Sequence, residues 1–194
     1  MSKKKKAKGG GAPSMRVGAA KPHGPLVDNK VHVFVDDQNL FWGIVNEQLG
    51  PGYRIDFGRL LTAACNDGKG GMRFVKTAYI AGVIPDDDTF WQIAKNQGFT
   101  VRRGYLGTGG GRTRSKQDDA YLITDITATL FEQPGPSTIV LVAGDADYVP
   151  PLLKSIEKGW RNEVVFINRG LSSALDAVTH LFRPLNAAQI QYHR

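Results

Sequence analysis

The sequence contains little cysteine and no long apolar run. Cys65 is the single cysteine among 194 residues, so an intrachain disulfide and a zinc site built on several cysteines are both excluded. No stretch approaches the roughly 20 apolar residues that span a bilayer, and residues 1–15 lack the apolar core of a secretory signal. We therefore predict a protein of the cytoplasm, a reducing compartment, without a membrane partner.

Net charge is also absent from most of the chain. The formal charge is +7, and residues 1–30 account for all of it, with eight lysines and arginines against one acid, Asp28. Residues 31–194 contain 17 basic and 17 acidic residues, which cancel. A general attraction to nucleic acid is thus indicated for the N-terminal segment alone.

The first 29 residues lack the composition of a folded segment. They combine a lysine run, a glycine tract at 9–11 and three prolines. Such a segment buries too little apolar surface to offset the entropy lost on ordering. We predict a flexible basic arm over residues 1–29 and one folded domain over residues 30–194. Two interpretations of the arm stay open: a solubilising tail, or a segment that binds phosphates or directs localisation.

From residue 31 onward, short apolar runs alternate with longer helical patterns. This alternation is typical of an α/β domain with three layers, in which helices cover both faces of a central parallel sheet of about five strands. Right-handed crossovers favour the strand order 3-2-1-4-5. Strands are predicted at 31–35, 74–81, 99–105, 138–142 and 164–167, and helices at 38–48, 57–65, 87–96, 118–131, 147–158 and 173–180. The strand at 138–142 is the most apolar, so we expect it near the centre of the sheet.

Acidic residues follow two of the predicted strands. Asp36 and Asp37 end the first strand, and Asp145 and Asp147 follow the fourth. In an open parallel sheet, chemistry is concentrated at the carboxyl ends of the strands. Because the predicted order makes the first and fourth strands neighbours, we expect these acids to converge at one edge.

The helix predicted at 118–131 begins with two further acids. Asp119 heads an apolar stripe that continues at positions 123, 126 and 130, and we expect this stripe to face the sheet. A first-turn carboxylate that points inward would meet Asp36 and Asp145. Asp118 and Asp125 share a different face of the helix, and we expect them to reach this edge less readily.

Carboxylates gathered at one point require compensation. They repel one another unless they are protonated, paired with cations or bound to a hard divalent metal. We predict that Asp36, Asp119 and Asp145 bind Mg²⁺ or Mn²⁺, which lowers the pKa of bound water and neutralises charge on a phosphoryl group. That chemistry suits phosphodiester hydrolysis. The competing interpretation is that each aspartate only caps the helix that follows it.

Three motifs resemble those of the NYN-domain family, PIN-like ribonucleases that include the LabA-like bacterial proteins. They are VFVDDQNL at residues 33–40, KQDD at 116–119 with the later Thr-Asp at 124–125, and GDADY at 144–148 with the downstream Gly159. Gln117 and Asp118 stand where the family has a glycine and an apolar residue. The resemblance implies a PIN-like fold and metal-dependent ribonuclease activity. It also implies an acidic site of Asp36, Asp119 and Asp145, assisted by Asn39 and Asp147.

Basic residues lie close to the proposed site in the sequence. Arg112, Arg114 and Lys116 fall in a glycine-rich segment, predicted as a mobile loop over 107–114, which leads into the acidic helix. We predict that they bind the RNA backbone, since phosphate contacts position a substrate without reading its sequence. A solvated loop with no binding role is the alternative.

Three aromatic side chains have two interpretations. Phe41, Trp42 and Trp91 either stack on bases, as in proteins that bind single strands, or pack in the core. Core packing is the interpretation that we favour for them.

Two other functions compete with a ribonuclease, and the sequence leaves open whether the protein forms a homo-oligomer. A phosphatase of the haloacid dehalogenase type also uses an early acid at a strand end, but it needs a second aspartate where Gln38 stands. An RNA-binding or scaffold domain without turnover would retain the fold. The retained set of acids argues against that scaffold.

Overall fold

The computed structural model describes residues 24–25, 27–45, 52–83, 89–109 and 112–192. Most of the arm predicted over residues 1–29 lies outside these ranges. The same is true of the end of the helix predicted at 38–48 and the start of the one predicted at 87–96.

Seven strands form one sheet in the order β4-β3-β2-β1-β5-β6-β7. Neighbouring strands are parallel except for β3 and β4. The five predicted strands correspond to β1, β2, β3, β5 and β6, so their predicted order is confirmed. The bounds are β1 (Lys30–Asp36), β2 (Phe74–Val83), β3 (Thr100–Gly109), β4 (Arg112–Lys116), β5 (Thr138–Val142), β6 (Arg161–Phe166) and β7 (Leu181–Pro184).

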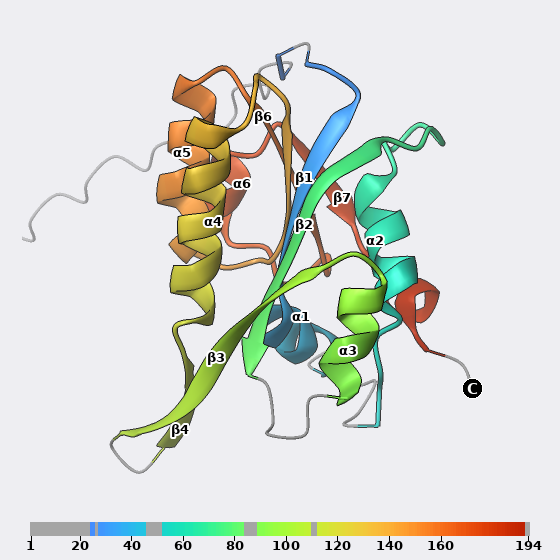
Figure 1. The fold of residues 1–194 in the computed structure, drawn as a ribbon, viewed down its shortest axis with the longest axis vertical. Coiled ribbons are helices and arrows are strands. Elements are labelled where there is room, and N and C mark those ends of the chain that lie inside the picture. Colours follow the sequence, from blue (N-terminus) through green and yellow to red (C-terminus); the bar gives the residue numbers. More distant parts are fainter. Residues whose placement is uncertain (1–23, 26, 46–51, 84–88, 110–111, 193–194) are drawn as a thin grey trace, which may run out of the picture.

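Helices cover both faces of this sheet, as the three-layer prediction requires. Figure 1 shows α4, α5 and α6 on one side and α2 and α3 on the other. α4 packs on β1, β2 and β3, whereas α2 packs on β1 and β5. The helices are α1 (Asp37–Ile44), α2 (Phe57–Cys65), α3 (Thr89–Asn96), α4 (Asp118–Glu132), α5 (Val149–Glu157) and α6 (Ser173–Ala177), with short 3-10 helices η2 (Ala146–Tyr148) and η3 (Ala187–Ile190). None of the helices among the described residues is long and apolar enough to cross a membrane.

β1 and β5 form the middle of the core. β1 is buried from Val31 to Asp36, and all five residues of β5 are buried. Strands that are covered on both faces bury every side chain, whichever way it points, which explains their continuous apolar character. β1 occupies the central place in the sheet, and β5 is next to it.

The glycine-rich segment is not the mobile loop that its composition suggested. β3 continues to Gly109, and β4 pairs with it in antiparallel register from Tyr105 with Lys116 to Gly109 with Arg112. Glycine offers the same backbone N–H and C=O groups as any residue, so a ladder forms without side-chain packing. Figure 1 shows this β3–β4 hairpin projecting beyond the rest of the sheet, at the end where α1 lies.

The C-terminal region also differs from the prediction. The helix predicted at 173–180 ends at Ala177, and the chain then adds β7 to the edge of the sheet beside β6. An open edge offers unpaired N–H and C=O groups, and pairing with them outweighs the weak helical pattern of this short segment.

Candidate active site at the carboxyl edge of the sheet

Asp36 lies at the end of β1 and is buried, with 4% of its surface exposed. Its Oδ1 accepts a hydrogen bond from the Asn39 backbone N–H at 2.9 Å, which caps α1. Its Oδ2 accepts one from the Tyr148 hydroxyl at 2.8 Å. Burial raises the pKa of Asp36 to about 7 against these two hydrogen bonds, and the negative charges of Asp119 and Asp118 add to the rise. Asp36 therefore caps a helix and also faces other acids.

Asn39 links the segment after β1 to the segment after β5 by a hydrogen bond. Its side-chain oxygen accepts a hydrogen bond from the Gly144 backbone N–H at 2.7 Å. Gly144 has no room for a larger residue, because a Cβ at this position would overlap the Gly170 carbonyl oxygen and the Phe166 ring. This contact fixes the backbone directly before Asp145.

Asp145 and Asp147 follow β5 and are both exposed. Oδ1 of Asp145 accepts a hydrogen bond from the Asp147 backbone N–H at 3.2 Å, which caps η2. The parallel pairing of β1 with β5, from Val31 with Thr138 to Val35 with Val142, places these acids beside the end of β1. The predicted meeting of the two strand ends is therefore observed.

The start of α4 departs from the predicted face. The buried residues of the helix are Asp118, Leu122, Asp125, Ile126, Thr129 and Leu130, whereas Asp119 and Ile123 are half-buried. We expected the face of α4 that begins with Asp119 to pack on the sheet. This expectation is wrong, because the buried face begins one residue earlier, at Asp118. The apolar positions were compatible with either choice, and packing on β1, β2 and β3 selected the face that contains Leu122.

The two neighbouring acids consequently have different surroundings. Asp118 is 2% exposed, and its charge raises the pKa of Asp36, Asp37 and Asp119. Burial raises the pKa of Asp119, followed by the charge of Asp118 and then those of Asp147 and Asp145. Asp119 is thus the acid whose charge interacts with both the β1 end and the β5 end.

Gln117 supports the assignment of Asp119 by a separate route. Its φ of 72° lies in the left-handed region, which glycine adopts most readily and where the related motif carries glycine. Asp118 then falls on the apolar position of the motif, which agrees with its burial, and Asp119 falls on the acidic one. Asp125, by contrast, forms a bidentate ion pair with Arg102 at 2.7 and 2.8 Å, which is a structural contact.

Sequence reasoning gave no separate role to two groups at this edge. Tyr148 is fully buried and holds Asp36. Asp37 is 9% exposed, and burial raises its pKa to about 7, with contributions from Asp36 and Asp118. Both residues lie within the quoted motifs, but only the tertiary contacts reveal what they do.

The chemistry of these acids suits a divalent cation. Each oxygen of Asp36 carries one hydrogen bond and keeps further acceptor capacity, while Asp119 and Asp145 are accessible to solvent. The pKa values of Asp36, Asp37 and Asp119 are raised first by burial and then by the charges of neighbouring aspartates, and Mg²⁺ or Mn²⁺ would compensate these negative charges. As the described side chains lie, no three acids, histidines or cysteines already form a metal-binding group.

The predicted RNA-binding residues are Arg112, Arg114 and Lys116. Their backbone forms β4, which leads through Gln117 into α4. Their side chains lie outside the described part of the structure. Their predicted role in RNA binding therefore stays a prediction.

Comparisons with known proteins identify the family. The model of the NYN domain matches residues 30–186. A crystal structure of a protein of unknown function from Vibrio parahaemolyticus RIMD 2210633 is similar, with a TM-score of 0.65 and 17% sequence identity over 90% of this chain and 100% of that one. At this identity the likeness concerns the fold. A search of curated proteins gave no match. The chain belongs to the NYN-domain family of PIN-like nucleases.

Proposed function

We propose that the protein is a metal-dependent ribonuclease that hydrolyses RNA phosphodiester bonds at the carboxyl edge of its sheet. One observation carries the proposal. Acids from β1, from the segment after β5 and from the first turn of α4 interact electrostatically at one place, where the pKa of Asp36 is raised to about 7 and that of Asp119 is raised as well. Perturbed acids gathered at the edge of an α/β sheet are typical of catalytic sites.

We assign the binding of Mg²⁺ or Mn²⁺ to Asp36, Asp119 and Asp145. When bound, the ion would activate water for attack on phosphorus and neutralise charge on the phosphoryl group. Asp36 is the most constrained of the three, since Tyr148 and the Asn39 backbone hold one oxygen each. Asp119 and Asp145 are less buried and offer adjustable carboxylates.

The remaining residues of the site have supporting roles in this proposal. Asn39 positions Asp145 through its hydrogen bond to Gly144. We assign to Asp147 the role of a proton acceptor, supported by its exposure and its electrostatic interaction with Asp119. Arg112, Arg114 and Lys116 supply positive charge on the strand that enters α4, where they would contact RNA phosphates.

The proposal extends to the whole chain. Residues 30–194 would form the nuclease domain, and the basic arm at 1–29 would add phosphate contacts that are independent of sequence. The single cysteine, Cys65, is buried, and its free thiol fits a role in the cytoplasm.

Cleavage of single-stranded and structured RNA tests the activity. We expect cleavage with Mg²⁺ or Mn²⁺, loss of cleavage with a chelator, and at least a hundredfold loss in Asp145→Asn with an unchanged melting temperature. Asp67→Asn is the matched control, because Asp67 lies in the turn before β2 at the opposite edge of the sheet. Equal cleavage by Asp145→Asn and the wild type would refute the assignment and indicate a contaminating nuclease.

The same assay decides the second candidate, an RNA-binding domain without turnover. The observation that favours it is that the described acids do not yet form a three-ligand metal group. RNA binding without cleavage in either metal would establish this alternative. Hydrolysis of a small phosphate monoester would instead point to a phosphatase.

A further inference from the structure

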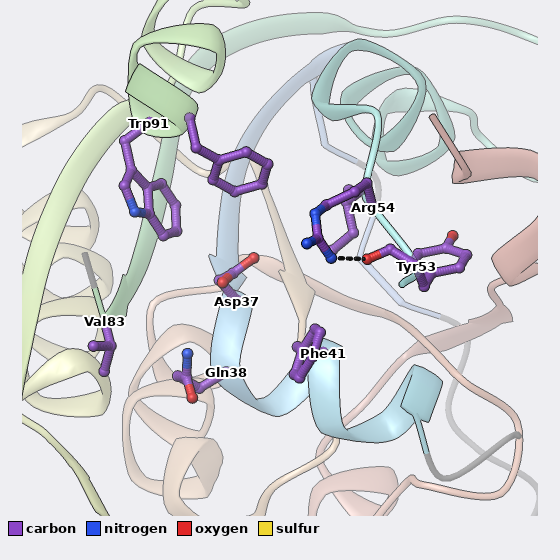
Figure 2. Close-up of a pocket in the computed structure, with 9 residues that line it drawn as sticks. Asp37, Gln38, Phe41, Tyr53, Arg54, Val83 and Trp91 are labelled. Atoms are coloured by element: carbon purple, nitrogen blue, oxygen red, sulfur yellow. Dashed lines mark hydrogen bonds between the residues drawn. The ribbon is translucent and has the colours of Figure 1, made fainter. Parts of the chain in front are cut away.

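A cavity of about 380 Å³ lies directly beside the acidic edge. Figure 2 shows Trp91 from α3 on one side of it, and Asp37, Gln38 and Phe41 from the first half of α1 on the other. Tyr53, Arg54, Ile55, Val83 and Phe90 complete its lining. A mostly apolar hollow of this size with a few polar groups is typical of a site for a small organic group.

Two aromatic residues in the lining, Phe90 and Trp91, pack against a third aromatic ring, that of Phe57. The rings of Phe90 and Trp91 lie 5.6 Å apart, and both pack on Phe57, at 5.1 and 6.1 Å between centroids. Trp91 is 2% exposed and Phe57 is 1% exposed. These two buried rings hold the exposed ring of Phe90 in place before any ligand arrives, which favours stacking of a flat ring on Phe90.

Two polar groups in the lining lack hydrogen-bond partners within the described part of the chain. The Trp91 indole N–H is buried and donates to nothing there. The carboxylate of Asp37 is almost fully buried, and no donor to it is found among those residues. Both side chains reach Gly82, where an added Cβ would lie 3.0 Å from Cβ of Asp37 and 3.0 Å from Cη2 of the Trp91 ring. The Asp37 carboxylate and the six-membered ring of Trp91 therefore lie together over one glycine.

Asp36 and Asp37 are consecutive but face different neighbours. Asp36 contacts Tyr148 after β5, whereas Asp37 packs against Gly82 in β2. Since consecutive Cα atoms are about 3.8 Å apart, the cavity and the acidic edge lie on either side of one peptide bond. In a nucleotide, the ribose joins the phosphate to the base, so a phosphate at the acidic edge would bring its base to the adjacent cavity.

From this arrangement we infer that the cavity is a subsite for an unpaired guanine base of the RNA, next to the cleaved phosphate. The inference rests on the proposed ribonuclease function. Guanine presents two adjacent N–H donors on its pairing edge, which complement the two oxygens of the Asp37 carboxylate. Adenine and cytosine offer one donor group on that edge, and uracil places its single N–H between two carbonyls.

A second cavity supports a base within a strand rather than a free nucleotide. It has a volume of about 360 Å³ and shares Arg54, Ile55 and Phe90 with the first. It continues past the start of α2 to Ile93 of α3 and to Tyr192, both of which are half exposed. Further nucleotides of the same strand fit along this hollow.

Binding to short oligouridylates that carry guanine, adenine, cytosine or uracil at one central position tests the subsite. The Asp145→Asn protein is used with fluorescence anisotropy, so that the result does not depend on turnover. We expect guanine to bind about tenfold more tightly than the other three bases. The basic arm adds the same affinity to all four and leaves the ratio unchanged. Equal affinities, or a preference for another base, would overturn the guanine subsite even if wild-type protein cleaves RNA.

Two substitutions in the Asp145→Asn background assign the preference to the cavity. Asp37→Asn keeps the shape of the side chain and should reduce the guanine preference to about twofold or less, whereas Asp67→Asn should leave it intact. Phe41→Leu removes a ring and should weaken binding of all four oligonucleotides by a similar factor. A guanine preference that survives Asp37→Asn in folded protein would place recognition elsewhere and overturn the inference.

Two further measurements, the cleavage position and the binding of guanosine monophosphate, separate a failure of the guanine subsite from a failure of the nuclease function. With wild-type protein, cleavage should occur at a fixed position relative to the single guanine. Absence of cleavage together with a guanine preference would refute the nuclease function alone. Guanosine monophosphate should bind far more weakly than the guanine oligonucleotide. Stronger binding of the free nucleotide, without discrimination among oligonucleotides, would overturn the RNA assignment in favour of a nucleotide ligand.

Discussion

Two regions of the molecule bury carboxylates, and they surround them with opposite charges. Glu163 in β6 is 2% exposed and receives hydrogen bonds from Arg73 at 2.9 and 2.7 Å, with further bonds from Arg161 and Arg183. Burial acts to raise the pKa of Glu163, but the hydrogen bonds from Arg73 and Arg161 outweigh it and hold that pKa below its ordinary value. Its charge is therefore fully compensated within the fold.

The acidic edge lacks this compensation. Among the described residues, no ion pair joins a lysine or arginine to Asp36 or Asp37, and the charges that shift their pKa values are those of other aspartates. A buried carboxylate thus has a structural role where arginines surround it. Where other acids surround it, the carboxylate can bind an external cation. Burial alone does not separate the two cases; the sign of the neighbouring charge does.

The largest expected effect on RNA cleavage tests whether Asp119 or Asp118 is the metal-binding acid of α4. Asp119→Asn should lower kcat/KM for RNA cleavage by at least about a hundredfold, because Asp119 interacts with the ends of both β1 and β5. Asp118→Asn should lower it by about tenfold or less. Steady-state kinetics at saturating Mn²⁺ measures both. A greater loss in Asp118→Asn would transfer the metal-binding role to that residue.

Removing a cation from the compensated region should cost folding stability rather than activity. Arg73→Met removes the bidentate partner of Glu163 and the side-chain donor to the Asn66 carbonyl oxygen, while the Cys65 carbonyl keeps the hydrogen bond from the residue 73 backbone N–H. The free energy of unfolding should fall by about 3–5 kcal/mol in chemical denaturation. Arg59→Met removes an exposed pair with Asp56 and should cost under about 1 kcal/mol. Equal losses in the two variants would contradict the contrast.

The two regions should also respond to pH in opposite directions. Asp36 and Asp37 have a pKa near the ordinary 3.8 when unfolded and about 7 when folded, so the folded state holds more protons between pH 4 and pH 7. With a chelator present, stability should fall as pH rises through this window, by roughly 1.4 kcal/mol per pH unit for each proton of difference. The lowered pKa of Glu163 contributes stability above its ordinary value of 4.5, and that contribution is lost as pH falls through its folded pKa.

Denaturation profiles from pH 4 to pH 8 measure this response. Asp37→Asn should flatten the fall between pH 4 and pH 7 and raise stability at pH 7, and Mn²⁺ should do the same in the wild type. A profile that rises across this window without metal would show that the acidic edge is compensated after all.

The smallest effect concerns the residue that positions α4. Gln117→Gly replaces a residue at φ 72° with the one that adopts this conformation without steric cost. We expect a gain of up to about 1 kcal/mol in the free energy of unfolding, with cleavage unchanged. A loss of stability would mean that Gln117 makes a side-chain contact that outweighs its backbone strain.

Much of this site follows from sequence reasoning, because its acids stand at positions that topology brings together. Asp36 and Asp145 follow apolar strands, and right-handed crossovers make those strands neighbours in the sheet. Helix-capping residues were also foreseen, and Asp36 and Asp145 do cap the helices that follow them while facing other acids. Capping and a place in an acidic cluster are compatible, so the first does not exclude the second.

The errors arose where two choices satisfy the local pattern equally. The inward face of α4 was assigned one residue too far along, because apolar residues lie on both sides of the true face. The glycine-rich segment forms a hairpin, because its backbone pairs with a strand whose length the sequence pattern did not indicate.

By itself, the sequence determined the strand order, the three layers and the chain positions of the acids, because side-chain periodicity and chain handedness are local properties. Tertiary structure alone decided which carboxylates are compensated. It added Arg73 and Arg183, from other parts of the chain, to the neighbouring Arg161 around Glu163. It also gave Asp36 a tyrosine and further acids, and turned Asp37 toward a cavity. Electrostatic environment depends on neighbours that are remote in sequence, and packing selects those neighbours only once the sheet has formed.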